Sequence, residues 1–209
     1  MNAVGPIRIL SVDDHPLLRE GISAMIQSQP DMLLVAEASN GRDGLARFRE
    51  HRPDVTLMDL RLPDMNGIDA MIAIRAEFKD ARIIILTTFE GDVEIQRALE
   101  AGAQGYLLKS TPPKELLDGI REVHGGKKRI PPEVVAHLAE HLGEEGLTAR
   151  EAQVLREIAG GNRNRDIAEH LFISEETVKV HVKHVMDKLG ASDRTEAVAI
   201  ALRRGIIQL

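Results

Sequence analysis

The chain has 209 residues and a net charge of −6, with no Cys, no Trp, one Tyr and four Phe. The lack of cysteine excludes disulfides and thiolate metal sites. The scarcity of aromatic side chains argues against recognition of single-stranded nucleic acid by stacking. No apolar run approaches the length of a membrane span, and the N-terminus has no basic-then-apolar secretory segment. We therefore expect a cytoplasmic protein with no membrane partner.

The charge is unevenly distributed along the chain. Residues 1–146 hold 17 Lys and Arg against 24 Asp and Glu, whereas residues 147–209 hold 10 against 9. An acidic front part and a mildly basic rear part predict two domains with different partners. The charge of the rear part is too small to indicate nucleic-acid binding by itself.

The first 124 residues alternate short apolar runs with helical patterns. The runs predict strands at 7–12, 32–38, 54–58, 82–86 and 105–108, and the periodic segments predict helices at 16–28, 41–50, 67–78, 92–101 and 113–124. This alternation is typical of an α/β domain with a doubly wound, five-stranded parallel sheet and helices on both faces. We assign the domain to residues 1–124.

Residues 125–146 have the composition of a linker. Pro131-Pro132 predicts the start of a short helix that reaches about Leu142, and Gly143-Glu144-Glu145-Gly146 is typical of an exposed joint.

Residues 147–209 show no strand pattern and predict an all-α domain of four helices. The first helix opens with a capping box from Thr148 to Glu151 and ends at Gly160-Gly161. The others are expected at about 165–171, capped by Asn164, at 175–189, capped by Ser174, and from a second capping box at Asp193–Glu196 to Gly205.

Polar residues follow four of the five predicted strands. Asp13-Asp14, Asp59, Thr87 and Lys109 each come at the end of an apolar run. Because open α/β sheets bind ligands at the carboxyl ends of their strands, these side chains are expected to share one crevice.

This set of side chains suits a divalent metal and a phosphoryl group. Mg²⁺ prefers hard oxygen ligands, which Asp13 and Asp14 offer. Asp59 is alone at the end of the central strand and is the candidate nucleophile. Lys109 and Thr87 would supply a cation and a hydroxyl donor to the phosphate.

The motifs Val12–His15, Leu57–Gly67, Leu86–Thr88 and Tyr106–Lys109 resemble the receiver domain of two-component response regulators. The resemblance covers about residues 6–124 and implies a flavodoxin-like fold. It implies that Asp59 takes a phosphoryl group from a sensor histidine kinase, with Mg²⁺ held by Asp14, Asp59 and the backbone carbonyl of Arg61. It also implies that Thr87 and Tyr106 move together as a switch. His15 is expected to be a loop residue rather than a metal ligand.

The segment 164–190 indicates a helix-turn-helix. In the predicted helix 175–189, Val178, Val182, Val185 and Leu189 form an inward stripe. Lys179, Val180 and Lys183 lie on another face, so in a major groove the two ammonium groups are expected to donate to guanine acceptors and the valine to contact a thymine methyl.

Residues 147–206 resemble the LuxR-type helix-turn-helix of NarL/FixJ regulators, notably through Ser174–His181 and Lys188–Gly190. The resemblance implies that Lys179, Val180 and Lys183 read bases. It suggests contacts of Thr177, Lys188 and Arg194 with the DNA backbone, and it places His181 against the first helix of the domain.

We therefore interpret the chain as a phosphorylation-activated transcription factor that binds double-stranded DNA as a homodimer. It is not expected to be an enzyme beyond assisting its own phosphorylation and dephosphorylation. One alternative is a phosphatase of the haloacid dehalogenase type, which requires an acid two residues after the nucleophile, where this chain has Arg61. The other is a helical domain used only for protein contacts.

Overall fold

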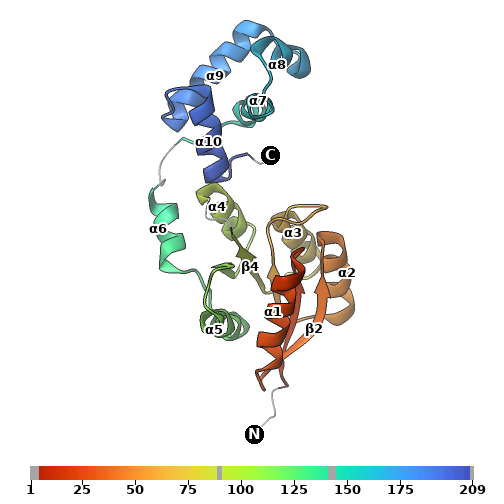
Figure 1. Ribbon diagram of the computed structural model, residues 1–209. Helices are drawn as coiled ribbons and strands as arrows, with labels where there is room; N and C mark the ends of the chain where they lie inside the picture. The colour runs from red at the N-terminus through yellow and green to blue at the C-terminus, as the bar shows by residue number, and fades with distance from the viewer. Residues whose placement is uncertain (1–4, 89–90, 141–144, 208–209) are drawn as a thin grey trace. The chain divides into compact units, whose positions relative to one another are not determined.

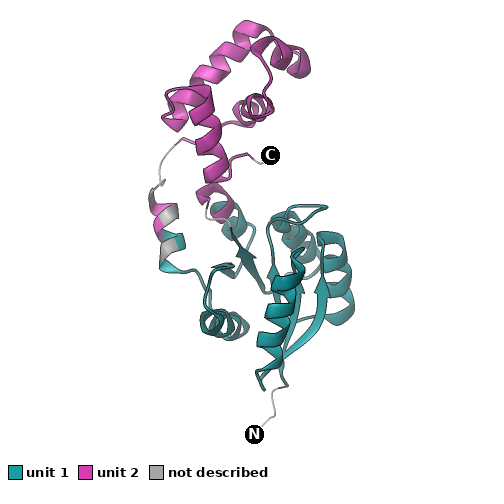
Figure 2. Ribbon diagram, viewed as in Figure 1, with its two compact units in different colours: residues 1–89, 96–135 teal, residues 90–95, 136–209 magenta. Residues whose placement is uncertain are grey.

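The computed structural model describes residues 5–88, 91–140 and 145–207. The chain divides into two compact units, residues 1–89 with 96–135 and residues 90–95 with 136–209 (Figure 2). The predicted end of the linker helix near Leu142 and the residues Gly143 and Glu144 of the predicted joint lie outside the described residues. Within the described part, no helix is both long and apolar enough to pass through a membrane.

The first unit is built on a five-stranded parallel sheet with the order β2-β1-β3-β4-β5 (Figure 1). The strands are β1 (Ile7–Val12), β2 (Met32–Ala38), β3 (Val55–Met58), β4 (Ile83–Thr87) and β5 (Gly105–Leu108). The predicted doubly wound sheet is confirmed, and each strand boundary lies within one residue of its prediction. The order reverses between β1 and β3, which is the position where such sheets form a ligand-binding crevice.

Successive strand residues point to opposite faces of this sheet, so both faces present apolar side chains. Helices cover both faces. On one face, Ile9, Leu57 and Leu107 pack with Ile22 of α1 and Ile120 of α5 in one buried cluster. On the other face, α2 approaches β1 closely. A Cβ on Gly44 would meet the Val12 side chain at 3.0 Å. The sheet is thereby buried on both sides, which explains its continuous apolar runs.

Five helices flank the strands of this sheet, and two of them, α2 and α3, begin at asparagine caps. The five are α1 (Pro16–Gln27), α2 (Gly41–His51), α3 (Gly67–Glu77), α4 (Asp92–Glu100) and α5 (Pro113–His124). Asn40 accepts a hydrogen bond from the amide of Asp43, and Asn66 accepts one from the amide of Ile68. These side-chain acceptors satisfy amides that have no partner inside their own helix.

The rest of the chain is helical. The elements are α6 (Pro132–Glu140), α7 (Ala149–Ala159), α8 (Asn164–Leu171), α9 (Glu175–Leu189) and α10 (Arg194–Arg204). The predicted four helices after residue 147 are confirmed. Val154 of α7, Ile167 of α8 and Val178 of α9 share one buried cluster, and Leu155 of α7, Val185 of α9 and Ala201 of α10 share another. Helix α9 is therefore fixed by three other helices.

Two predicted caps differ from the structure. Asn164 is the first residue of α8, and the cap position belongs to Arg163, whose amide donates to Asp166 Oδ2 at 3.0 Å. Asp193 does cap α10, but Glu196 accepts from Ser192 rather than from Asp193. In both cases a carboxylate of the helix accepts from a backbone amide one residue earlier than predicted. The amide belongs to Arg163 instead of Asn164, and to Ser192 instead of Asp193.

Phe172 ends α8 in the left-handed region, with φ of 54°, and its side chain is 95% exposed. An L-residue with a Cβ loses about 1–2 kcal/mol in this conformation. We expect Phe172→Gly to raise the free energy of unfolding by about 1 kcal/mol relative to Phe172→Ala, because both variants lack the ring and only the alanine keeps a Cβ. Denaturant unfolding of the two variants checks this, and equal midpoints would contradict it.

Candidate functional sites

The carboxyl ends of β1, β3 and β5 bring three predicted site residues into direct contact. Lys109 Nζ lies 2.8 Å from Asp59 Oδ2 and 2.7 Å from Asp13 Oδ2. The side chains of Asp59 and Asp13 are 2% and 3% exposed, and that of Lys109 is 9% exposed. Two buried carboxylates therefore share one buried ammonium.

Asp14 and His15 complete the cluster on its solvent side. His15 Nδ1 lies 2.7 Å from Asp14 Oδ1 and 3.1 Å from Asp13 Oδ1. One ligand atom each from Asp13, Asp14, His15 and Asp59 lies within 4.8 Å of all the others. His15 is also the N-cap residue of α1. The sequence predicts a loop position for His15, and the structure places its imidazole beside the carboxylates of the acidic cluster.

Burial and pairing shape the ionisation of the two central groups. Burial raises the pKa of Asp59, although the Lys109 ammonium opposes this effect. For Lys109, burial acts to lower the pKa, but hydrogen bonds to Asp13 and Asp59 outweigh it and raise the pKa overall. Lys109 is therefore held as a fixed cation beside the candidate nucleophile.

The other predicted receiver residues lie at the same edge of the sheet. Thr87 is the last residue of β4 and is fully buried, and its carbonyl accepts from the amide of Lys109 at 2.8 Å. Tyr106 lies on β5 with no exposed surface. Thr88 is exposed.

The loop after Asp59 is folded back tightly on itself. Arg61 and Asn66 form a short antiparallel bridge, and the amide of Gly67 donates to the carbonyl of Leu60 at 2.9 Å. Asp64 accepts from the amides of Gly41 and Arg42 at 2.8 Å and 3.0 Å, which ties this loop to the start of α2. The loop thus holds the backbone of Arg61 beside Asp59.

Gly67 permits this fold because its Cα lies against the Asp59 backbone. A Cβ at this position would lie 1.9 Å from the Asp59 carbonyl oxygen, a backbone atom that a side-chain rotation cannot move. We expect Gly67→Ala to lower the free energy of unfolding by about 1–3 kcal/mol or more, as overpacking does. Gly21→Ala is the matched control, since a Cβ there meets nothing within 4 Å. Denaturant unfolding that ranks the two variants equally would contradict the prediction.

The donor set fits a magnesium ion. It includes the carboxylates of Asp13, Asp14 and Asp59, and hard oxygens of this kind are the ligands that Mg²⁺ takes in proteins. Asp14 and His15 are exposed while Asp13 and Asp59 are buried, so the cluster is open to solvent on one side only.

The recognition helix α9 separates an apolar face from a polar face, as predicted. Val178, Val182 and Val185 are buried, whereas Lys179, Val180 and Lys183 are exposed. Ser174 caps the helix by accepting from the amide of Thr177 at 3.1 Å. Lys179 Nζ donates to Glu176 Oε1 at 2.7 Å, one turn earlier on the same helix.

Two residues that are predicted to contact the DNA backbone already have hydrogen-bond partners inside the second unit. Lys188 donates to Glu151 Oε2 at 3.0 Å and to the carbonyl of Gly146 at 3.3 Å, and its side chain is only 16% exposed. This pairing ties the end of α9 to the start of α7, and the contact of Lys188 with the DNA backbone stays a prediction. Arg194 is exposed and donates to Asn164 Oδ1 at 3.0 Å.

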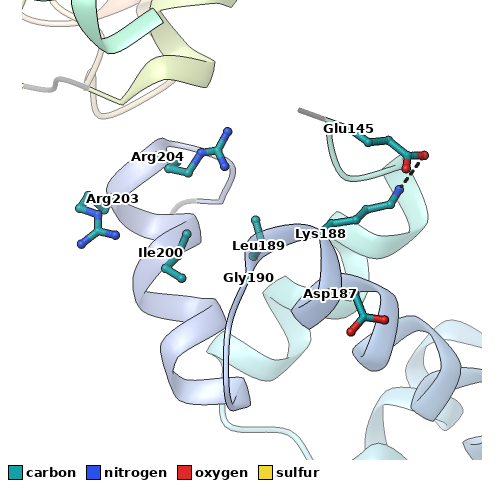
Figure 3. Close-up of a pocket in the computed structure, with 8 residues that line it drawn as sticks. All are labelled: Glu145, Asp187, Lys188, Leu189, Gly190, Ile200, Arg203 and Arg204. Atoms are coloured by element: carbon teal, nitrogen blue, oxygen red, sulfur yellow. Dashed lines mark ion pairs between the residues drawn. The ribbon is translucent and has the colours of Figure 1, made fainter. Parts of the chain in front are cut away.

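An open pocket of about 630 Å³ lies beside Lys188, where α9 ends and α10 passes (Figure 3). Figure 3 shows Lys188 directed toward Glu145, and the two form an ion pair of 3.4 Å. Arg203, Arg204 and Asp187 also line the pocket, which belongs entirely to the second unit and includes none of the acidic cluster. Both cationic and anionic side chains line the pocket, so it favours neither an anionic nor a cationic ligand.

Comparisons with known proteins agree with these two sites. Residues 9–121 match the response regulator receiver domain, and residues 145–201 match the bacterial regulatory proteins of the luxR family. The chain is 42% identical to the uncharacterized transcriptional regulatory protein YxjL of Bacillus subtilis strain 168, over 97% of this chain and 98% of that protein. It is 37% identical to the response regulator protein VraR of Staphylococcus aureus, over 97% and 99%.

A solved structure extends the comparison over most of the chain. The structure of the two-component response regulator RcsB in complex with DNA aligns with a TM-score of 0.70 and 25% identity, covering 95% of this chain and 99% of that chain. Together with the receiver cluster and the helix-turn-helix, these matches show that the chain belongs to the response regulators that combine a receiver domain with a LuxR-type helix-turn-helix domain.

Proposed function

We propose that this chain is a cytoplasmic transcription regulator that is switched on by phosphorylation of Asp59. The observation that carries the proposal is the buried Asp59 carboxylate, which has an ammonium 2.8 Å away and further carboxylates within metal-binding distance. In this proposal residues 1–124 act as the receiver, residues 125–146 as the linker and residues 147–209 as the DNA-binding domain.

The chemistry is a phosphoryl transfer from a phosphohistidine of a sensor kinase. A carboxylate oxygen of Asp59 forms a bond to phosphorus as the phosphorus–nitrogen bond of the donor breaks. Lys109 stays charged and neutralises the negative charge that the phosphoryl oxygens bring into the crevice. Mg²⁺, when bound by Asp14, Asp59 and the Arg61 carbonyl, supplies further neutralisation and orients the phosphoryl group.

The proposed switch uses two buried residues, Thr87 at the end of β4 and Tyr106 within β5. Thr87 offers its hydroxyl to the phosphoryl group on Asp59, and Tyr106 follows the movement of Thr87. Both side chains are fully buried, so a displacement of either one must repack its neighbours. In this proposal the chain assists its own phosphorylation and does not turn over a separate substrate.

The proposed output is the binding of double-stranded DNA by a dimer. Lys179, Val180 and Lys183 are exposed on the polar face of α9 and would read base edges in the major groove. Thr177, Lys188 and Arg194 would contact phosphates. Two such helices bind two half-sites, which is why a homodimer is expected. The alignment with the RcsB–DNA complex supports this part of the proposal.

Mass spectrometry after incubation with acetyl phosphate and Mg²⁺ tests the acceptor. The wild-type chain is expected to gain the mass of one phosphoryl group, and Asp59→Asn is expected to gain none. Asp69→Asn is the matched control, because Asp69 is exposed on α3 and outside the cluster. A wild-type chain that gains no mass under saturating donor, or an Asp59→Asn variant that gains it equally, would overturn the proposal.

The affinity for DNA with and without the phosphoryl donor tests the switch. The phosphorylated wild-type chain is expected to bind a duplex selected from a random pool more tightly than the untreated chain. Equal affinities would remove the switching claim, and a complete lack of DNA binding would favour a helical domain used for protein contacts.

A further inference from the structure

We propose that Arg150 is a positioning residue for DNA recognition: it holds the turn before α9 and thereby sets where Lys179 and Val180 lie. The inference rests on the proposed function, because it concerns the reading of DNA by α9. It adds to that function a residue of α7 that acts through the backbone of the turn and does not itself contact DNA.

The guanidinium of Arg150 binds the end of α8. Nη2 donates to the carbonyl of Leu171 at 2.8 Å, and Nη1 donates to Gln153 Oε1 at 3.0 Å on the next turn of α7. Leu171 is the last residue of α8, so its carbonyl lies beyond the reach of the amides of its own helix. A cation at this end of a helix is also favoured by the helix dipole. The side chain is therefore oriented by α7 and anchored on α8.

The turn that Arg150 holds is very short. Phe172 and Ile173 are the two residues between the end of α8 and Ser174, the cap of α9. Ile173 packs against the buried cluster that α7, α8 and α9 share, whereas the Phe172 side chain is exposed. Apolar packing is non-directional, while a hydrogen bond fixes both a distance and an angle. The hydrogen bond from Arg150 therefore fixes the direction in which the chain enters α9.

The next residue of α7, Glu151, holds the other end of α9. Its side chain is buried and accepts from Lys188 Nζ at 3.0 Å. The 15 residues of α9 make a helix about 22 Å long, so two adjacent residues of α7 fix points near both of its ends. The N-terminal part of a recognition helix contacts base edges in the major groove. The end that Arg150 holds is thus the one that carries Lys179 and Val180.

A positioning role differs in its effect on DNA binding from a phosphate contact and from a purely structural role. A residue that positions the reading helix strengthens binding to the correct sequence and hardly changes binding to other duplexes, which depends on phosphates. A phosphate contact strengthens both and adds about one to the salt slope. A residue that only stabilises the fold changes the unfolding midpoint and leaves the affinity of the folded chain unchanged.

Fluorescence anisotropy of the full chain with two labelled duplexes, at several salt concentrations and with acetyl phosphate present, tests the inference. One duplex is selected from a random pool, and the other has the same length and an unrelated sequence. Arg150→Ala is expected to bind the selected duplex about tenfold more weakly, the size of one lost base contact. Its affinity for the unrelated duplex should stay within about twofold of the wild type, with an unchanged salt slope.

Two further variants accompany Arg150→Ala. Arg150→Lys keeps a donor for the Leu171 carbonyl but loses the fork that also binds Gln153, so it should bind the selected duplex only about threefold more weakly than the wild type. Arg156→Ala removes an exposed arginine from the same helix and is the matched control. It should change neither affinity nor the salt slope.

Three results would overturn the inference. Equal losses on both duplexes with a smaller salt slope would make Arg150 a phosphate contact. A lower denaturant midpoint with wild-type affinity for both duplexes would make it purely structural. An Arg150→Lys chain that binds no better than Arg150→Ala would remove the hydrogen bond as the cause. None of these results affects the proposed function, whereas a wild-type chain that binds neither duplex overturns both.

Gln153→Ala decides the question if Arg150→Ala does not fold. This variant keeps the guanidinium and removes the exposed acceptor that orients it. An about threefold loss of affinity for the selected duplex alone supports the positioning role, and wild-type affinity for that duplex overturns it. Because all chains are compared under the same donor conditions, the result does not depend on how strongly phosphorylation changes the affinity.

Discussion

Replacing Lys109 with Met is expected to slow the phosphorylation of Asp59 by about 10²–10³-fold, the typical cost of removing one preorganised group that stabilises developing negative charge. Lys109 Nζ lies 2.8 Å from Asp59 Oδ2, and its pKa is raised, so it is charged when the phosphoryl group arrives. Methionine keeps most of the apolar stem and removes only the charge. The measurement is the rate of mass gain with acetyl phosphate at saturating Mg²⁺.

The same variant should bind Mg²⁺ more tightly than the wild type. Asp13 and Asp59 lose the cation they share, so their negative charge is left for the metal alone. Lys114→Met, which removes an exposed lysine at the start of α5, is the matched control and should change neither quantity. A Lys109→Met chain that is phosphorylated at the wild-type rate would show that the ammonium is not part of the chemistry.

The sequence predicted the sheet and the polar crevice because both follow from local pattern. Each strand of the first unit is a short apolar run. The carboxyl ends of parallel strands lie at one edge of the sheet, so the residue after each strand lies at that edge. The positions of Asp13, Asp59 and Lys109 therefore followed once the strands were assigned. The caps of α2 and α3 are contacts of the same local kind, since Asn40 and Asn66 accept from amides only two or three residues away.

What the sequence could not provide are contacts between residues far apart in the chain. Lys188 donates to Glu151, which is 37 residues away, so nothing in the local pattern of α9 indicated this ion pair. The tie between Asp64 and the start of α2 spans 23 residues and was equally invisible. His15 was placed in a loop by its position, but the direction of its imidazole depends on the neighbouring carboxylates.

Lys183 and Lys179 are expected to contribute unequally to DNA binding, although both are exposed on the same face of α9. A lysine that donates to a guanine edge contributes about 1–3 kcal/mol of discrimination. Lys179 must first leave Glu176, to which it donates at 2.7 Å, whereas the described residues offer Lys183 no such ion pair. Lys183→Ala should therefore weaken binding to the selected duplex more than Lys179→Ala does.

Glu176→Gln provides the matched test of that difference, because it keeps the shape of the side chain and removes its charge. An exposed ion pair of this kind contributes about 0.2–1 kcal/mol, so releasing Lys179 should tighten DNA binding by no more than about fivefold at low salt. Most of the gain should disappear in the Lys179→Ala background, because there is no ammonium left to release. The small part that remains comes from the loss of the Glu176 charge, which repels the DNA phosphates. Fluorescence anisotropy with a labelled duplex measures all four affinities. Equal effects of Glu176→Gln in both backgrounds would mean that Glu176 acts on the phosphates alone and does not restrain the base-reading lysine.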